Sequence, residues 1–460
     1  MTPEPVQPAL ADAPAAAPAK NILDLNAFDP ARAAGLEPAA AALVARRRRA
    51  FGPTSVLFYE EPVTVVRGEG VFLHGPNGER YLDAYNNVPS VGHCHDHVVA
   101  AVSRQLATLN THTRYLYDNV YEYSERLLAT MPAEVANIVF TCTGSESTDL
   151  ALRIAESASG GTGFVVTEGA YHGNTAAATA ISPSSLSDRP KPVHVEAVPA
   201  PDVYHRPAAD LGARFAAEVT AAIARLEARG VKFAGLVVDG IFSSDGIYAE
   251  PAGFLAPAVA AARAAGGLYV ADEVQPGFGR TGEAMWGFAR HGLVPDLVVM
   301  GKPMGNGFPM GGVAARPEWL ERFGARNGYF NTFGGNPVAA AAGLAVLDVI
   351  EGEALQANAL ATGRHLLAAL RDLSGRDPRI GDVRGAGLYL GVELVADPET
   401  RAPDPALATR LINGLRRRGV LIGAAGLSGN ILKIRPPLCF GAEHADTLVA
   451  ALGEALAEEG

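Results

Sequence analysis

The chain has 460 residues, which is more than a single hydrophobic core usually supports, so we expect two packed units. Hydrophobic residues make up 48% of the sequence and charged residues 19%, as is typical of a soluble globular enzyme. The formal net charge of −11 argues against nucleic acid as a partner, because phosphate binding requires a concentrated basic surface.

The first 80 residues predict a tail, a helix and a hairpin. Residues 1–20 are rich in Pro and Ala and lack a basic stretch followed by an apolar one, so we expect a mobile tail rather than a secretory signal. The basic run Arg46–Arg49 lies in an Ala- and Leu-rich segment and indicates the solvated face of a helix. The turn residues Pro76, Asn77 and Gly78 between short apolar runs predict a β-hairpin.

The middle of the chain predicts an α/β fold. Short apolar runs alternate there with segments whose apolar residues recur at helical spacing, which favours a mostly parallel sheet with helices on both faces. The candidate strands are 137–142, 163–168, 233–240, 267–272 and 296–301. After about residue 345 long Ala- and Leu-rich helices are interrupted by two apolar runs, which predicts a small α+β domain. We therefore expect a tail at 1–20, a segment at 21–80 that joins the small domain, a large domain at 81–345 and the small domain at 346–460.

Two exclusions concern the protein's surroundings. No apolar run approaches the length of a membrane span. The three cysteines, Cys94, Cys142 and Cys439, are spaced too irregularly for a disulfide framework and fit a reducing compartment. We expect a cytoplasmic protein that does not bind membranes.

The stretch CTGSES, which follows the first of these strands, has the composition of a phosphate seat. Thr143 and Glu146 predict a capping box at the start of a helix. The N–H groups of Gly144 and Ser145, at the positive end of that helix, could hold a phosphate. The same residues also occur where they only cap a helix, so the pattern alone leaves both readings open.

Two charged residues end later strands. Asp272 ends a buried strand, where a carboxylate is costly unless it is paired. Lys302 follows the strand 296–301 between glycines, and an apolar, glycine-lined pocket lowers the pKa of a lysine toward that of a nucleophilic amine. A phosphate seat, an acid and a lysine at one sheet edge together suggest pyridoxal phosphate, which needs a lysine for its Schiff base and an acid that keeps its ring nitrogen protonated.

The motifs DEVQPGFGRTG, GKPMGNGFP, TGSES, GAYHGN and NTFGGNP resemble the class III aminotransferases of fold type I, from about residue 45 to the end of the chain. The resemblance implies a mostly parallel seven-stranded sheet in the large domain and a homodimer with shared active sites. It also implies that Val274 and Tyr171 pack on opposite faces of the cofactor ring and that Gln275 lies near the ring hydroxyl. Thr332 would reach the phosphate bound by the neighbouring subunit.

Within that family, NNVPSVGHCHDHVV, YFNTFGGNPV and ILKIRPPLCF look like the branch that contains the ethanolamine-phosphate and phosphohydroxylysine phospho-lyases. Some positions depart from the family pattern. Thr148 stands where the phosphate loop usually has asparagine, and Asp239, which we count among the cofactor-binding residues, replaces a longer acid. Lys433 and Ser244 occupy the positions of the arginine and glutamate that handle the α-carboxylate in ornithine- and GABA-type relatives.

The cluster GHCHDH, residues 92–97, has metal-binding residue types but no second His or Cys cluster to complete a site, so we predict no metal. We expect His172 to position its neighbours rather than act as a base, because Lys302 can move the proton.

Two reactions share their first steps: Lys302 releases the cofactor to a substrate amine and then removes a proton from the carbon that bears the nitrogen. We predict an aminotransferase that moves an amino group from a primary amine or amino acid to a keto acid. The alternative is a phospho-lyase that acts on a phosphorylated amino alcohol. A regulatory or structural cofactor-binding protein is disfavoured because Asp272 and Lys302 are both present.

Overall fold

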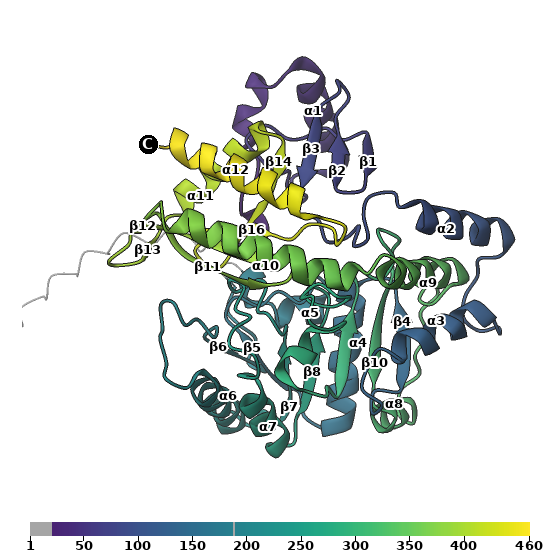
Figure 1. Ribbon diagram of the computed structural model, residues 1–460. Helices are drawn as coiled ribbons and strands as arrows, with labels where there is room; N and C mark the ends of the chain where they lie inside the picture. The colour runs from purple at the N-terminus through teal and green to yellow at the C-terminus, as the bar shows by residue number, and fades with distance from the viewer. Residues whose placement is uncertain (1–20, 187–188) are drawn as a thin grey trace, which may run out of the picture.

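The computed structural model describes residues 21–186 and 189–460, so the predicted tail at residues 1–20 lies outside the described residues. Figure 1 shows a large sheet with its helices in the lower half of the molecule and smaller sheets above it. The upper part combines the purple N-terminal segment with the yellow C-terminal one.

The central sheet has seven strands in the order β4-β10-β9-β8-β7-β5-β6. Their bounds are β4 Asn137–Thr141, β5 Gly163–Thr167, β6 Val195–Val198, β7 Phe233–Val238, β8 Leu268–Asp272, β9 Leu297–Met300 and β10 Gly311–Ala315. β10 runs antiparallel to both of its neighbours, and the other strand pairs are parallel. This confirms the predicted α/β fold with a mostly parallel sheet. The five predicted strands are all present, whereas β6 and β10 were not predicted.

Side chains of successive residues alternate between two cores, because neighbouring residues of a strand point to opposite faces. Val165, Leu236 and Tyr269 belong to one core, whereas Phe164 and Val237 belong to the other. The first core contains residues of α6 (Leu211–Ala228), α7 (Ala256–Ala264), α3 (Asp118–Leu128) and α9 (Pro337–Gly352), and the second contains residues of α4 (Gly144–Ser159) and α8 (Pro317–Gly324). The strands are buried on both faces, which explains their nearly continuous apolar sequences.

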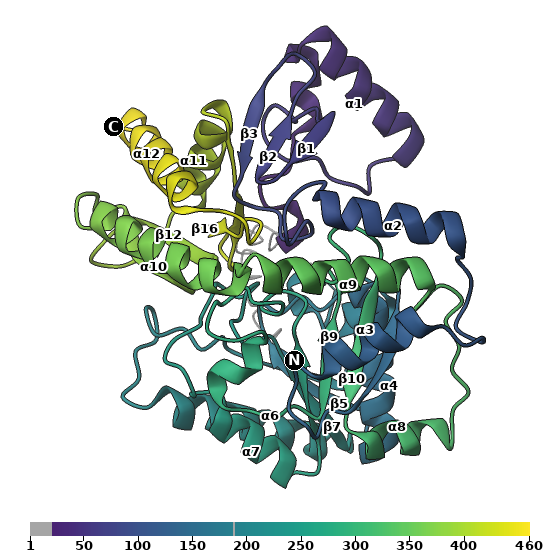
Figure 2. The ribbon, with the colours of Figure 1, turned by 45° about the vertical axis from the view of Figure 1, so that its right-hand side comes forward.

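The upper part of the molecule contains two further sheets. One has the strand order β11-β12-β16-β15, with β11 Ile380–Ala386, β12 Tyr389–Asp397, β15 Gly423–Ala425, β16 Ile431–Ile434 and the short β13 Ala402–Pro403 paired to β12. The helices there are α10 (Leu355–Ser374), α11 (Pro405–Arg417) and α12 (Ala442–Glu458). Figure 2 shows α9 and α10 running one after the other above the large sheet.

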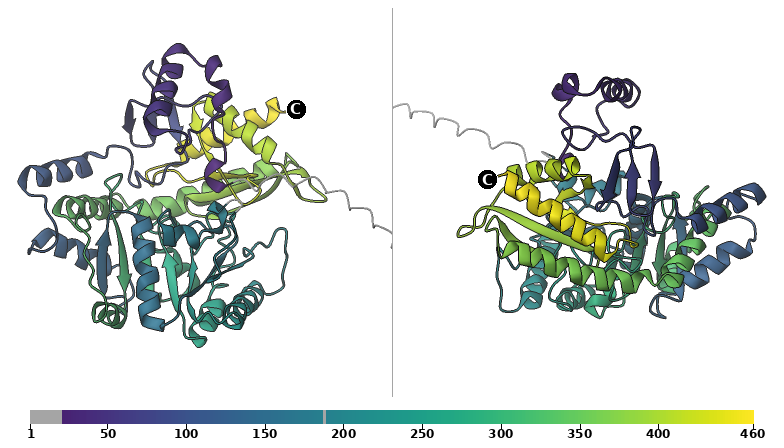
Figure 3. Two further views of the ribbon diagram at one scale, coloured as in Figure 1. Left: turned by 180° about the vertical axis from the view of Figure 1, so that it is seen from behind. Right: turned by 45° about the horizontal axis from the view of Figure 1, so that its top comes forward.

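The other sheet joins the two ends of the chain. Its strands are β1 Arg67–Glu69, β2 Phe72–His74, β3 Arg80–Asp83 and β14 Val420–Leu421, in that order. β2 and β3 form the predicted antiparallel hairpin, and β14 pairs with β3 in parallel. The N-terminal segment therefore packs with C-terminal residues (Figure 3), although the domain boundaries themselves stay a prediction.

Three further α-helices occur among the described residues. They are α1 (Pro38–Phe51), α2 (Asp96–Thr108) and α5 (Ala176–Ala180). α1 carries Arg46–Arg49 and has no buried residue, as expected for a solvated helix. Among the residues that the structure describes, no helix is both long and apolar enough to cross a membrane.

Candidate active site

A cavity of about 290 Å³ lies where β4, β8 and β9 end. Seven of the nine predicted site residues line it: Gly144, Ser145, Tyr171, Asp272, Val274, Gln275 and Lys302. Asp239 and Thr332 lie outside this lining. The carboxyl ends of parallel strands are where open α/β sheets bind ligands, so the position of the cavity follows from the sheet.

The predicted phosphate seat comprises the start of α4 and a neighbouring turn. Thr143 Oγ1 accepts a hydrogen bond from the Glu146 N–H at 3.1 Å, which confirms one half of the predicted capping box. The Glu146 carboxylate accepts from the Cys142 N–H at 2.7 Å, one residue earlier than in the usual box.

Glycine is required beside this seat. A Cβ on Gly173 would lie 2.7 Å from Ser145 Oγ, and the φ of Gly173 is +137°. A Cβ on Gly144 would lie 3.1 Å from Val274 Cγ2. Glycine at these two positions therefore allows the start of α4 to pack closely against its neighbouring segments beside the cavity.

Asp272 is held by two donors inside the protein. Its Oδ2 lies 2.6 Å from His172 Nδ1, its Oδ1 accepts from the Val274 N–H at 3.0 Å, and it is 5% exposed. His172 is also buried, and Thr148 Oγ1 donates to its carbonyl at 2.8 Å. These contacts agree with the predicted positioning role of His172. Thr148 therefore helps to hold the backbone of His172 in place.

Lys302 lies just beyond β9, the parallel neighbour of β8. The strands pair in a register that sets Asp272 opposite Val299, so the acid and the amine leave the same sheet edge. Lys302 is exposed to the cavity, although many protein atoms surround its amine. This enclosure, with a smaller contribution from the positive charge of Arg435, lowers the pKa of its amine to about 8. A fraction of the amine is therefore neutral near pH 7, and a neutral amine is nucleophilic and can accept a proton.

Arg435, to which the sequence had assigned no role, holds Gln275. Its Nη1 donates to Gln275 Oε1 at 2.6 Å, and Asn87 Nδ2 donates to the same oxygen at 3.0 Å. Arg435 also donates through Nε to the Tyr85 carbonyl at 3.0 Å and stacks over the Tyr85 ring at 4.8 Å. Gln275 and Arg435 are 160 residues apart, so no local pattern could have paired them.

Two further cations lie near Arg435. Lys433, on β16, is 7% exposed, and burial lowers its pKa, with smaller contributions from Arg435 and Lys302. Arg280 donates to the carbonyls of Leu388 and Pro436, and burial lowers its pKa to about 9. Lys433 and Arg435 are two residues apart, and side chains at that spacing in an extended segment point to the same side. This spacing would have been the sequence signal for a pair of cations.

Two predicted cofactor residues do not line the cavity in this single chain. The Asp239 carboxylate accepts from the N–H groups of Ile241 at 2.8 Å and Ser243 at 3.0 Å, so it caps its own turn. Burial raises its pKa, and the charge of Asp272 adds to that effect. Thr332 is exposed on the loop that precedes α9. The cofactor roles of both residues stay predictions.

The histidine cluster is dispersed over separate partners. His93 pairs with Asp83 at 2.7 Å. His95 lies 2.9 Å from the Glu353 carboxylate, and His97 lies 2.8 Å from that of Asp348. Within residues 21–186 and 189–460, no group of three or more His, Cys, Asp or Glu side chains is arranged to hold a metal ion.

The cavity fits pyridoxal phosphate, because a glycine cradle at a helix start, a buried carboxylate and a lysine of lowered pKa line one space. The fold and this site define a fold-type-I pyridoxal-phosphate enzyme.

Residues 58–456 match the family model "Aminotransferase class-III", and the chain belongs to that family. It is 39% identical over 423 residues to the Drosophila melanogaster protein "Alanine--glyoxylate aminotransferase 2-like", covering 89% of this chain and 86% of that one. It is 38% identical over 436 residues to "Ethanolamine-phosphate phospho-lyase homolog 1" of Caenorhabditis elegans, covering 90% and 93%.

A solved phospholyase from Arthrobacter in complex with phosphoethanolamine is 45% identical, with a TM-score of 0.87, and the match covers 90% of this chain and 99% of that chain. An amine transaminase from an uncultivated Pseudomonas species in its PLP-bound form is 30% identical, with a TM-score of 0.80 and coverage of 87% and 96%.

Proposed function

We propose that the chain is a pyridoxal-phosphate-dependent phospho-lyase that acts on a phosphorylated amino alcohol. The observation that carries this proposal is the group of cations near Lys302. Arg435 lowers the pKa of both Lys302 and Lys433, and burial lowers the pKa of Lys433 further although the Asp239 carboxylate opposes that effect. A phosphate dianion would relieve that cost, because it offers two negative charges to two cations. The 45% identity to the Arthrobacter phospholyase supports the same choice.

Lys302, Asp272 and the two nearby cations each have a role in this reaction. Pyridoxal phosphate, when bound, supplies the electron sink that makes the amine-bearing carbon acidic. Lys302 Nζ then accepts the proton from that carbon. Asp272, fixed by His172, keeps the cofactor's ring nitrogen protonated. As the C–O bond on the next carbon breaks, phosphate departs with the bonding electrons, and Lys433 and Arg435 stabilise its charge. Water completes the reaction by releasing ammonia and an aldehyde.

Transamination is the second candidate, and a specific observation favours it. A carboxylate on both the amino donor and the keto acceptor would satisfy the same cations in both half-reactions. A glutamate mask would then be unnecessary, in agreement with Ser244 at that position. The 39% identity to the Drosophila aminotransferase 2-like protein supports this reading.

The two reactions differ in their need for a keto acid. We would incubate the holoenzyme with phosphoethanolamine and no keto acid, and measure inorganic phosphate and ammonia. A phospho-lyase releases both in equal amounts over many turnovers. Amine consumption that stops after one turnover, releases no phosphate and resumes with a keto acid would overturn the proposal in favour of transamination. Arg435→Gln should raise the KM for phosphoethanolamine while the cofactor content of the enzyme changes by a smaller factor.

We also propose a homodimer with shared active sites. Large apolar side chains are exposed near the Thr332 loop and on the segment before α3, including Phe333 at 70% and Leu116 at 88%. Such side chains are characteristic of a protein–protein contact, and a second copy of this chain would cover them. Thr332 is exposed beside Phe333, where it could reach a partner's cofactor. The free state of all three cysteines supports a further proposal, that the enzyme acts in the cytoplasm.

A further inference from the structure

The loop that follows β7, residues 239–248, contacts the turn that carries Tyr171 and His172. Asp245 Oδ1 accepts from the Gly169 N–H at 2.8 Å, and Oδ2 accepts from Thr167 Oγ1 at 2.7 Å. A Cβ on Gly169 would lie 2.7 Å from the Asp245 Cα, so the two backbones are in close contact. Asp245 therefore fixes the start of the turn whose next residues line the cavity.

The loop has a conformation that its own sequence disfavours. Phe242 has a φ of +50° and Ile247 a φ of +68°, in a left-handed region that large and β-branched residues rarely adopt. Both side chains are buried, Phe242 against Phe215 and Phe254, and Ile247 in a small core with residues of β12 and β16. Such a conformation persists only where the surroundings hold it.

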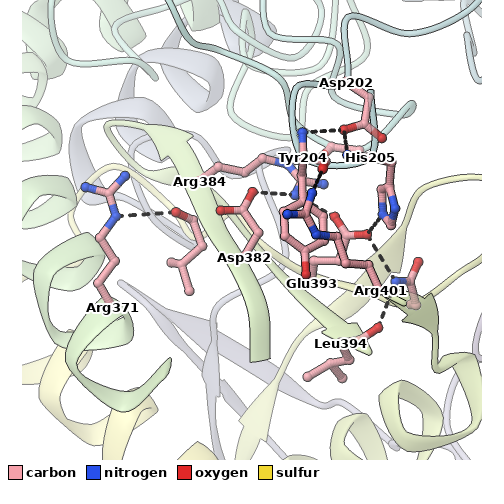
Figure 4. A network of polar contacts seen from close by, with 12 residues as sticks. Asp202, Tyr204, His205, Arg371, Asp382, Arg384, Glu393, Leu394 and Arg401 are labelled. Carbon is pink, nitrogen blue, oxygen red and sulfur yellow. Dashed lines mark hydrogen bonds and ion pairs between the residues drawn. The ribbon is translucent and has the colours of Figure 1, made fainter. Parts of the chain in front are cut away.

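Arg384, on β11, supplies part of that support. Its Nε donates to the Gly246 carbonyl at 2.9 Å, and its guanidinium lies over the Tyr248 ring at 4.5 Å. Its Nη1 donates to Glu393 at 2.6 Å and to Asp382 at 2.8 Å, as Figure 4 shows. One guanidinium thus contacts the loop and the small-domain sheet at the same time.

Glu393 fixes Arg384 from the other side. It is 2% exposed on β12, and its second oxygen lies 2.5 Å from Nε2 of His205, which belongs to the segment after β6 (Figure 4). Asn430 Nδ2 approaches the same oxygen at 3.4 Å. A buried carboxylate with these partners orients the guanidinium strongly, because both charges are away from water.

From these contacts we propose that Arg384 is a positioning residue for the cofactor cavity. It holds the loop 239–248 through Gly246 and Tyr248, and the loop holds the Tyr171–His172 turn through Asp245. A movement of the small domain relative to the large one would therefore displace the turn that lines the cofactor cavity. This inference rests on family membership and on the cofactor, and it is independent of whether the reaction is elimination or transamination.

The experiment compares Arg384→Gln, Arg384→Lys and Asp245→Asn with a matched control, Arg379→Gln. Arg379 also belongs to the small domain and pairs with Asp377 at 2.6 Å, but its side-chain partners are Asp377 and the Leu456 carbonyl rather than the loop. For each variant we would measure pyridoxal-phosphate affinity of the apoprotein, circular dichroism of the bound cofactor's visible band, and the apoprotein Tm. The dichroism reports how the ring sits against its neighbours and needs no turnover.

Arg384→Gln should weaken cofactor binding by tenfold or more and reduce the dichroic band. Arg384→Lys, which retains a charge for Glu393, should fold well and show a smaller change of the same kind. Combining Arg384→Lys with Asp245→Asn should add little to the larger single effect, because the two residues act along one path. Arg379→Gln should lower the apoprotein Tm without changing affinity or dichroism. The proposal would be overturned if both Arg384 variants lowered the apoprotein Tm without changing cofactor affinity or dichroism. It would also be overturned if the effects of Arg384→Lys and Asp245→Asn on cofactor affinity were fully additive in the double variant.

Discussion

Lys302 should capture pyridoxal phosphate at a far lower pH than an ordinary lysine does. Only the neutral amine attacks an aldehyde, so the capture rate follows the neutral fraction. Enclosure by the protein, with the charge of Arg435, places the Lys302 pKa at about 8. At pH 8 about half of the amine is then neutral, against about 0.3% for the ordinary pKa of 10.5, a difference of roughly 160-fold.

The measurement mixes apoprotein with pyridoxal phosphate in a stopped-flow instrument and follows the absorbance of the lysine-linked cofactor from about pH 6 to about pH 10. Because a lowered pKa keeps the amine neutral above it, the rate should rise with pH and level off above about 8. Nα-acetyl-lysine, run at the same pH values, corrects for titration of the cofactor itself. Lys302→Ala should give no lysine-linked absorbance.

A second variant separates the two causes of the shift. Arg435→Gln removes the neighbouring cation and should move the midpoint upward, but it should not restore 10.5, since enclosure is the larger cause. A wild-type midpoint near 10.5 would refute the reasoning. An unchanged midpoint in Arg435→Gln would assign the whole effect to enclosure.

Three further predictions concern the same cavity. Asp272→Asn should retain cofactor but lower kcat about a hundredfold or more, because an amide cannot keep the ring nitrogen protonated; cofactor content and steady-state kinetics together check this. Gly173→Ala should weaken cofactor binding in a titration, since its Cβ would lie 2.7 Å from Ser145 Oγ, whereas Gly253→Ala, which also has a positive φ but no atom within 4 Å of the added Cβ, should leave binding unchanged. Thr332→Ala should cost about 1.5–3 kcal/mol of cofactor affinity if this hydroxyl completes a partner's site. Sedimentation of that variant with and without cofactor tests the assembly, and an active wild-type monomer would contradict it.

The sequence predicted those elements that can be recognised from their own residues, without knowledge of their neighbours in the fold. The strands β7, β8 and β9 are buried on both faces, so their apolar runs were visible without knowledge of their neighbours. β10, with the sequence GGVAA, has almost no side chains from which a strand could be recognised. Its pairing depends on β4 and β9, which lie elsewhere in the chain.

The residues of the site also fall into those that could be predicted from local sequence and those that could not. Asp272 and Lys302 could be predicted because each ends a buried strand with a charge. The bond between Arg435 and Gln275 joins residues 160 positions apart, and only the packed fold brings them together. The hydrogen bonds of Asp239 with the N–H groups of Ile241 and Ser243 depend on the local turn, which composition does not reveal, and its cofactor role stays a prediction.

The pairing of Asp272 with Val299 fixes where the acid lies relative to the lysine that follows β9. The acid and the amine belong to adjacent strands, so their spacing is set by backbone hydrogen bonds rather than by either side chain. A slip of two residues between β8 and β9 would preserve which face each side chain points to and much of the apolar packing, yet it would carry Asp272 about 6.6 Å along the strand, farther than the width of a pyridine ring. A protein misfolded in this way could look native by its helical content and still be unable to align the acid and the amine on one cofactor.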